Sequence, residues 1–123
     1  MNVNAIKVAE AFVNLKNTDF RSPGDFSGGS VAQFRSSLGS SPWERHADGE
    51  ESLQAIEGAV RIELLTETQR AQVDLAAGQM LIVPRGLGHR HLITDHLAEL
   101  HITAGSTEHS NREDPRTPAE TDQ

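Results

Sequence analysis

Short segments in which apolar and polar residues alternate follow one another through the second half of the chain. Residues 59–65 place three aliphatic side chains at alternate positions, with Arg61 and Glu63 between them, which predicts a half-buried β-strand. Further strands are predicted over 51–58, 71–75, 80–84, 89–94 and 99–105, each ending at a glycine, a proline or a polar turn. Turn signals at intervals of roughly 8–12 residues, with no long helical period, indicate an all-β sandwich or barrel.

The two ends of the chain differ from this central region. Residues 1–20 mix apolar and polar positions, and their spacing does not decide between a short helix and an edge strand. The last 18 residues contain no Leu, Ile, Val or Phe, which predicts a segment that is disordered or laid over the surface. We therefore expect an N-terminal arm at 1–30, a β-barrel at 31–105 and a polar, flexible tail at 106–123.

Aliphatic residues at alternate strand positions are expected to form the core of this barrel. They are Leu53, Val60, Ile62, Leu64, Val73, Leu75, Leu81, Val83, Leu100 and Ile102. Gly58, Gly78 and Gly86 are expected at turns that need unusual backbone angles.

Charge and composition exclude several classes of partner and site. The net charge of the 123 residues is −7 and no basic run occurs, so neither nucleic acid nor an anionic membrane surface is an expected partner. The absence of cysteine excludes disulfides, thiolate zinc sites and a cysteine nucleophile. The longest apolar run, Met80–Val83, is too short to span a membrane. No signal-peptide pattern begins the chain, and we expect a cytoplasmic protein.

One stretch, Pro42–Gly58, concentrates chemistry-bearing residues ahead of a predicted strand. It holds His46 together with Glu44, Glu50 and Glu51. Acidic groups beside a strand are costly if they are buried alone, so the stretch is either a solvated loop or half of a cation site. Residues i and i+2 of a strand share a face, so Glu44 and His46 can converge on one point.

A second stretch carries a recognisable spacing. The segment GQMLIVPRGLGHRH runs Gly78, five residues, Pro84, one residue, Gly86, two residues, His89. This spacing resembles the second motif of the cupin superfamily. His91, two residues further on, shares a strand face with His89.

The first stretch is similar to the first cupin motif. That motif has His-x-His, three or four intervening residues, a glutamate, six intervening residues and a glycine. His46, Glu51 and Gly58 fit its last three positions, and Glu44 stands where the first histidine is usual. The asparagine often found after the second-motif histidine is Ile93 here. The resemblance covers about residues 30–105 and is greatest to small single-domain cupins.

The resemblance implies a cupin-type double-stranded β-helix, a jelly-roll barrel, with a metal in its lumen. The implied ligands are Glu44, His46, Glu51 and His89. Nitrogen and oxygen ligands without sulfur suit a divalent transition metal such as Mn, Fe, Ni, Co or Zn, and the sequence does not choose among them. Such a site keeps a position open for water or substrate, which permits Lewis-acid chemistry.

Each candidate also has a structural interpretation. Glu44 could be a rim carboxylate paired with Arg45 or Arg61, and a slip of one residue in register would exchange Glu50 and Glu51. His91 and His101 are the candidate catalytic residues, or else they fill space in the barrel. His96 and His109 are expected to be inert.

Two residues near the motifs have the same double interpretation. Trp43 could wall the pocket mouth or close the core. Arg85 could attract an acidic substrate or be solvated in its turn.

The residue types that the chain lacks exclude some catalytic mechanisms but do not identify the function. No tyrosine occurs and no lysine follows Lys16, which excludes a tyrosine base and disfavours a Schiff base. The leading hypothesis is a metal-dependent enzyme acting on a small organic molecule, with His91 or His101 moving a proton. The alternatives are a non-catalytic binder of a metal or small molecule, and a structural cupin whose metal site has decayed.

The partners that we expect are a small-molecule ligand and a second copy of the chain. Small cupins commonly pair through a sheet, so the resemblance implies a homodimer. Apolar residues of the N-terminal arm are the candidate contact: Ile6, Val8, Phe12, Val13 and Leu15.

Overall fold

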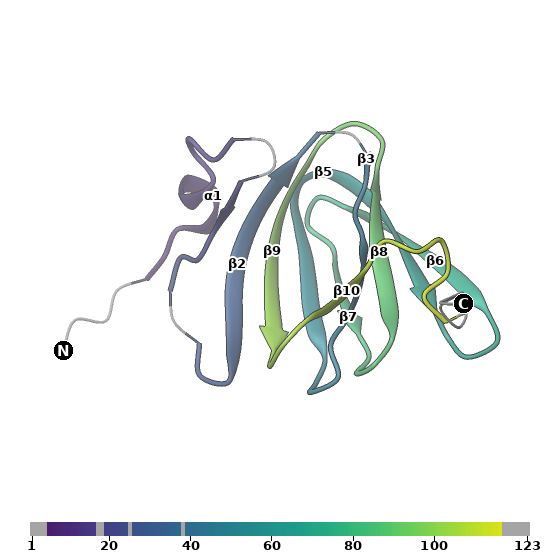
Figure 1. Cartoon of the computed structure of the whole chain (residues 1–123). Helices are drawn as coiled ribbons and strands as arrows, with labels where there is room; N and C mark the ends of the chain where they lie inside the picture. Colours follow the sequence, from purple (N-terminus) through teal and green to yellow (C-terminus); the bar gives the residue numbers. More distant parts are fainter. Residues whose placement is uncertain (1–4, 17–18, 25, 38, 117–123) are drawn as a thin grey trace.

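The computed structural model describes residues 5–16, 19–24, 26–37 and 39–116. Its strands are β1 (Phe20–Arg21), β2 (Gly29–Ser36), β3 (Gly39–Ser40), β4 (Trp43–Arg45), β5 (Glu51–Leu65), β6 (Arg70–Ala76), β7 (Met80–Val83), β8 (Gly88–Ile93), β9 (Leu97–Ala104) and β10 (Glu108–Ser110). They form one curled antiparallel sheet, with the main order β1-β2-β9-β5-β8-β4-β10 (Figure 1). The predicted all-β class is confirmed, and the curl gives the sheet the shape of a half-barrel.

Strand β5 belongs to both layers of this curled sheet. Its first half pairs with β7 and β9, and its second half pairs with β6 and β8. The sequence predicted two strands separated by a turn at Gly58. One strand of 15 residues is present instead, with a register shift between Ala55 and Glu57. Gly58 adopts a φ of 77°, which bends the strand from one layer into the other without ending it.

The core lies between the two layers, and most of the expected aliphatic residues reach it. Leu53 and Ile62 have no exposed surface, and Val83 has almost none. The prediction that Ile102 lies in the core is wrong, because this residue is 36% exposed on the outer face. The inner positions of β9 are taken by polar residues instead, namely Glu99, His101 and Thr103.

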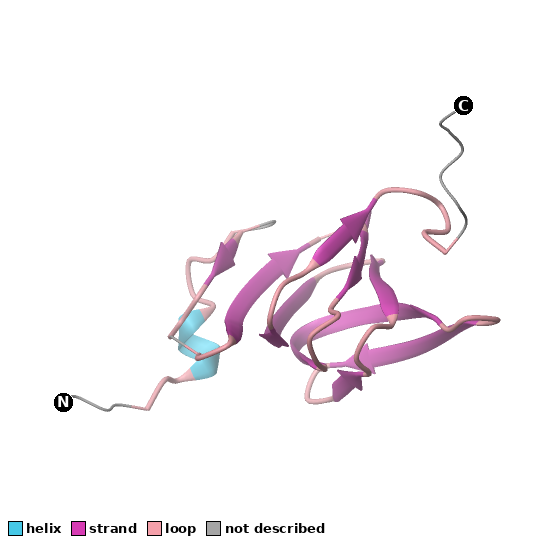
Figure 2. Cartoon of the chain, turned by 60° about the horizontal axis from the view of Figure 1, so that its bottom comes forward, coloured by secondary structure: helices cyan, strands magenta, loops and turns pink. Residues whose placement is uncertain are grey.

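The N-terminal arm covers the outer face of the layer that contains β2 and β9. It includes α1 (Val8–Ala11), the short helix beside that layer in Figure 2. Phe12 and Leu15 are buried against Ala98. The guanidinium of Arg35 donates to the carbonyl of Phe12 at 3.3 Å and pairs with Glu57 at 2.9 Å. The arm is therefore packed against its own chain.

Part of the predicted tail also lies against the sheet. Strand β10 pairs with β4, with Glu108 opposite Arg45. Trp43, which is 2% exposed, donates from its indole to the carbonyl of Glu113 at 3.0 Å. Residues 106–116 are thus laid over the surface, one of the two outcomes that the sequence allowed. No helix in the described ranges is long and apolar enough to cross a membrane.

Candidate metal centre

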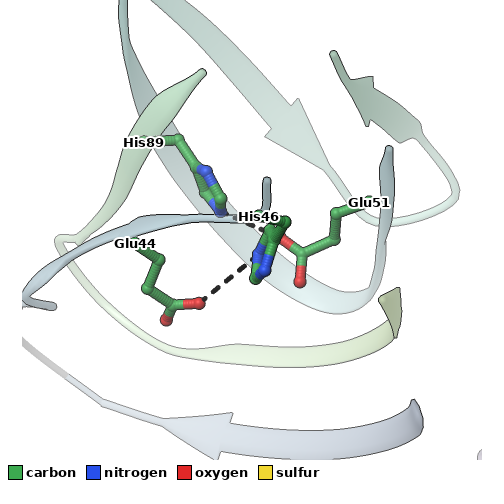
Figure 3. A group of neighbouring side chains, drawn as sticks. All are labelled: Glu44, His46, Glu51 and His89. Carbon is green, nitrogen blue, oxygen red and sulfur yellow. Dashed lines mark ion pairs between the residues drawn. The ribbon is translucent and has the colours of Figure 1, made fainter. Parts of the chain in front are cut away.

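Strands β4, β5 and β8 bring together the four residues that the motifs singled out. Glu44 in β4 lies directly opposite His89 in β8, so both side chains are on one face of the sheet. His46 follows β4, and Glu51 opens β5 on the facing layer. Figure 3 shows the four side chains pointing toward a common centre.

The distances within this group are short. Nε2 of His89 lies 2.8 Å from Oε1 of Glu51, and Nε2 of His46 lies 3.2 Å from the same oxygen. Oε2 of Glu44 is 3.8 Å from Nε2 of His46. One ligand atom from each of the four residues lies within 4.8 Å of all the others, which is close enough for one ion to contact them all.

Burial distinguishes these residues from an ordinary acidic surface. The side chains of His46, Glu51 and His89 are 3%, 2% and 0% exposed, whereas that of Glu44 is 23% exposed. Glu50 is exposed, so Glu51 is the glutamate that points inward. Glu44 is not held as a rim carboxylate by either arginine considered for it, because Arg45 pairs with Glu108 and Arg61 pairs with Asp74.

The protonation of Glu51 is set by its neighbours. Burial alone would raise the pKa of its carboxyl group, but the imidazoles of His46 and His89 and the hydroxyl of Thr103 more than offset burial and lower it. The pKa of His46 is raised, since the nearby carboxylates, Glu51 foremost, outweigh the opposite effect of burial. An ionised Glu51 is the form that ligates metals.

Three atoms of the group lack hydrogen-bond partners. Nε2 of His46, Oε1 of Glu51 and Nε2 of His89 are buried, yet none makes a hydrogen bond of acceptable geometry among the described residues. Buried polar atoms are almost always satisfied, so their convergence calls for a group that accepts several lone pairs at once. A divalent transition metal does so, and two imidazoles with two carboxylates suit it.

The opposite side of each imidazole is held in the orientation that ligation requires. Nδ1 of His89 lies 3.3 Å from the carbonyl oxygen of Leu87. A carbonyl only accepts, so in the neutral form of His89, the form that ligates metals, the proton lies on Nδ1 and Nε2 offers its lone pair. Nδ1 of His46 lies 3.0 Å from the hydroxyl of Thr107, and the hydroxyl of Thr103 donates to Oε2 of Glu51 at 2.6 Å.

A second polar cluster lies beside the first and contains both candidate catalytic histidines. Oε1 of Glu99 is 2.7 Å from Nε2 of His91 and 2.9 Å from Nε2 of His101. Nδ1 of His101 faces Oε2 of Glu51 at 4.0 Å. Despite full burial, which lowers it, the pKa of His91 is raised to about 9 by Glu99. The ring of Phe34 meets both imidazoles edge-on.

The sequence interpretation missed three residues of these clusters: Glu99, Thr103 and Thr107. Glu99 and Thr103 stand two residues either side of His101 in β9, so the two-residue period of a strand was the signal that would have found them. Thr107 lies beyond the last predicted strand, where no period exists. His109, expected to be inert, lies opposite Glu44 in the pairing of β10 with β4.

Comparisons with known proteins address the fold. No protein-family model matches the sequence, and no curated protein matches it either. A cupin-2 domain protein from Shewanella frigidimarina superposes with a TM-score of 0.66 at 21% identity, over 80% of this chain and 93% of that one. This chain has the cupin fold.

Two further structures superpose on this chain to a similar extent. Protein NMB1881 from Neisseria meningitidis has a TM-score of 0.69 at 17% identity, over 83% of this chain and 100% of that one. Hydroquinone 1,2-dioxygenase PnpCD, in complex with Cd²⁺ and 4-hydroxybenzonitrile, has a TM-score of 0.65 at 22% identity, over 81% of this chain and 72% of that one. The predicted cupin jelly roll is confirmed.

Proposed function

We propose that this protein is a metal-dependent cupin enzyme that acts on a small organic molecule. The observation that supports the proposal is the convergence of three buried ligand atoms from His46, Glu51 and His89, none of which makes a hydrogen bond of acceptable geometry within the part of the chain that the structure describes, together with the carboxylate of Glu44. Buried polar atoms without a hydrogen bond are uncommon in folded proteins, and three of those in the described residues meet at this one point. A neighbour of the same fold, hydroquinone 1,2-dioxygenase, is known in complex with Cd²⁺ and an aromatic ligand.

In this proposal some of the buried residues bind the metal and others transfer protons. Glu44, His46, Glu51 and His89 would hold the metal, which polarises a bound group or lowers the pKa of a bound water. His91 of β8 or His101 of β9, which are both buried beside this group, would give or take a proton at the substrate. Hydrogen bonding to Leu87 and Thr107 fixes the ring orientation of the two histidine ligands.

The metal content of untagged protein tests this proposal first. We expect close to one equivalent of Mn, Fe, Co, Ni or Zn after purification or after incubation with the metal ion alone. His46→Ala and His89→Ala should each lower the metal affinity at least tenfold, because each removes one ligand. His96→Ala is the matched control, since the side chain of His96 is 52% exposed in a turn. Metal-free wild-type protein that binds none of these ions would refute the proposal and leave a structural cupin.

Turnover separates an enzyme from a non-catalytic binder. Metal-loaded protein screened against small hydroxylated and carboxylated molecules, with oxygen uptake and product formation measured, should show activity. His101→Gln should lower the rate without removing the metal, because His101 lies beside the ligand Glu51 and is not within the ligand group. Tight binding of a molecule without turnover would identify a binding module.

A further inference from the structure

A pocket of about 720 Å³ opens beside the candidate metal centre. Its wall includes Glu44, the most exposed of the four candidate ligands, and residues 85–88 of the turn between β7 and β8. The C-terminal segment closes its other side. This volume suits a small organic molecule, which would reach the metal from the side of Glu44.

The lining of the pocket is much less acidic than the chain as a whole. Four arginines and three glutamates are among its lining residues, while the chain carries a net charge of −7. One of those glutamates is Glu44, whose charge a bound metal would neutralise. A cation without a partner in such a pocket attracts small anions more strongly than the acidic surface around it does.

Arg85 is the arginine of this pocket that is free to bind a ligand. Arg45 pairs with Glu108, and Arg116 pairs with Asp114. Arg112 donates to a backbone carbonyl at 2.6 Å. Arg85 is exposed and makes no hydrogen bond or ion pair with any described residue. Its five N–H donors match the two oxygens of a carboxylate.

The backbone of the turn that carries Arg85 is tied to the segment that carries His46. The backbone N–H of Gly86 donates to the carbonyl of His46 at 2.9 Å. Gly86 adopts a φ of 78°, which completes the turn between Arg85 and the strand that carries His89. The backbone of Arg85 is therefore held next to the segments that carry His46 and His89, and its side chain can reach a ligand bound beside them.

The pocket also offers apolar surface. Trp43, Leu65 and Leu87 are among its lining residues. An anionic head on an apolar body, as in an aromatic acid, matches a wall that combines one unpaired guanidinium with aromatic and aliphatic side chains.

We propose that this pocket binds a small organic acid. The guanidinium of Arg85 binds its carboxylate, and the rest of the molecule faces the metal at Glu44. The proposal deepens the proposed function, since it names the substrate class of the same centre. Arg85 is the residue that sets specificity for charge.

The test compares benzoate with benzamide, which has nearly the same shape and no charge, by titration calorimetry on metal-loaded protein. Benzoate should bind at least tenfold more tightly than benzamide. Arg85→Gln should abolish this preference, and Arg85→Lys should keep part of it. Arg21→Gln, an exposed arginine of β1 outside the pocket, should leave it intact.

Two results would overturn the proposal: equal binding of the two probes to the wild type, or an unchanged preference in Arg85→Gln. Absence of binding by either probe would overturn it as well. The same titration on metal-free protein keeps the two proposals apart. Suppose that the protein binds no metal but still prefers benzoate to benzamide, and that Arg85→Gln removes this preference. That result would refute the metal centre and still support the anion pocket.

Discussion

Glu99 is a carboxylate with no exposed surface, held between the imidazoles of His91 and His101. Burial alone would raise its pKa, but the two imidazoles, His91 foremost, hold that pKa at about 2 against an ordinary value of 4.5. The folded state therefore binds fewer protons than the unfolded state between these two values. The resulting stabilisation is complete above about pH 4.5 and is lost as the pH falls toward 2.

This difference in protonation predicts an acid-dependent stability that one substitution reduces, because the lowered pKa of Glu51 contributes to the same dependence. In metal-free protein, the free energy of unfolding should fall between pH 4.5 and pH 2, measured by urea denaturation at a series of pH values. Glu99→Gln should flatten this part of the curve while lowering stability near neutral pH, because His91 loses its counter-charge. A variant that keeps the wild-type slope would contradict the assignment.

A second prediction for a single residue concerns Thr107 and its effect on metal affinity. Its hydroxyl holds Nδ1 of His46, and groups that orient a histidine ligand typically contribute 10–100-fold to metal affinity. Thr107→Val should therefore weaken binding of Zn²⁺ by about tenfold or more, measured by competition with a chelator. Thr94→Val, at an exposed position, should not change the affinity, and equal affinities in both variants would exclude the positioning role.

The sequence predicted the residues whose spacing follows a motif, but not the residues that support them. Glu44, His46, Glu51 and His89 were expected together and lie together. The partner of each buried charge depends on which strands face one another across the barrel, and a single sequence does not contain that information. Thr107 and His46 are 61 residues apart, and no local pattern links them.

At the scale of elements, β9 explains why the predicted core was partly wrong. Its apolar residues Leu100 and Ile102 face outward, while Glu99 and His101 face the lumen. The alternation was recognised correctly, but the wrong face was assigned to the core. Burying the polar face of a strand costs free energy unless the buried groups find partners. The paired His and Glu side chains are such partners.

The bend of β5 at Gly58 leads us to predict that replacing this glycine costs more stability than replacing Gly78, which lies in a turn. Gly58 and Gly78 both have positive φ angles of 77° and 90°. A Cβ at Gly58 would collide with the carbonyl oxygen of His96, whereas none of the described atoms lies within 4 Å of a Cβ at Gly78. Gly78→Ala should cost about 1–2 kcal/mol for backbone strain alone, and Gly58→Ala should cost at least about 1 kcal/mol more because of the collision.

Chemical denaturation of both variants measures these costs. Equal destabilisation would mean that the bend at Gly58 relaxes freely and that the close contact with His96 has no energetic weight. The sequence predicted that both glycines need unusual angles. It did not distinguish a glycine that ends a strand from one that bends it.

At the scale of the whole molecule, the homodimer stays a prediction. Phe12 and Leu15 pack within the chain, but Ile6 and Val13 are 52% and 60% exposed. Light scattering at micromolar concentration should give twice the chain mass of 13.4 kDa. Val13→Asp should shift the protein toward the monomer with unchanged circular dichroism, because it places a charge in the contact. A wild-type monomer would contradict the prediction.

The continuity of β5 through both layers bears on how the molecule comes apart. Both layers pair with this strand, so one layer cannot separate from the other without breaking hydrogen bonds of β5. Native-state hydrogen exchange should therefore find the slowest amides along this one strand, and they should exchange together in a single global event.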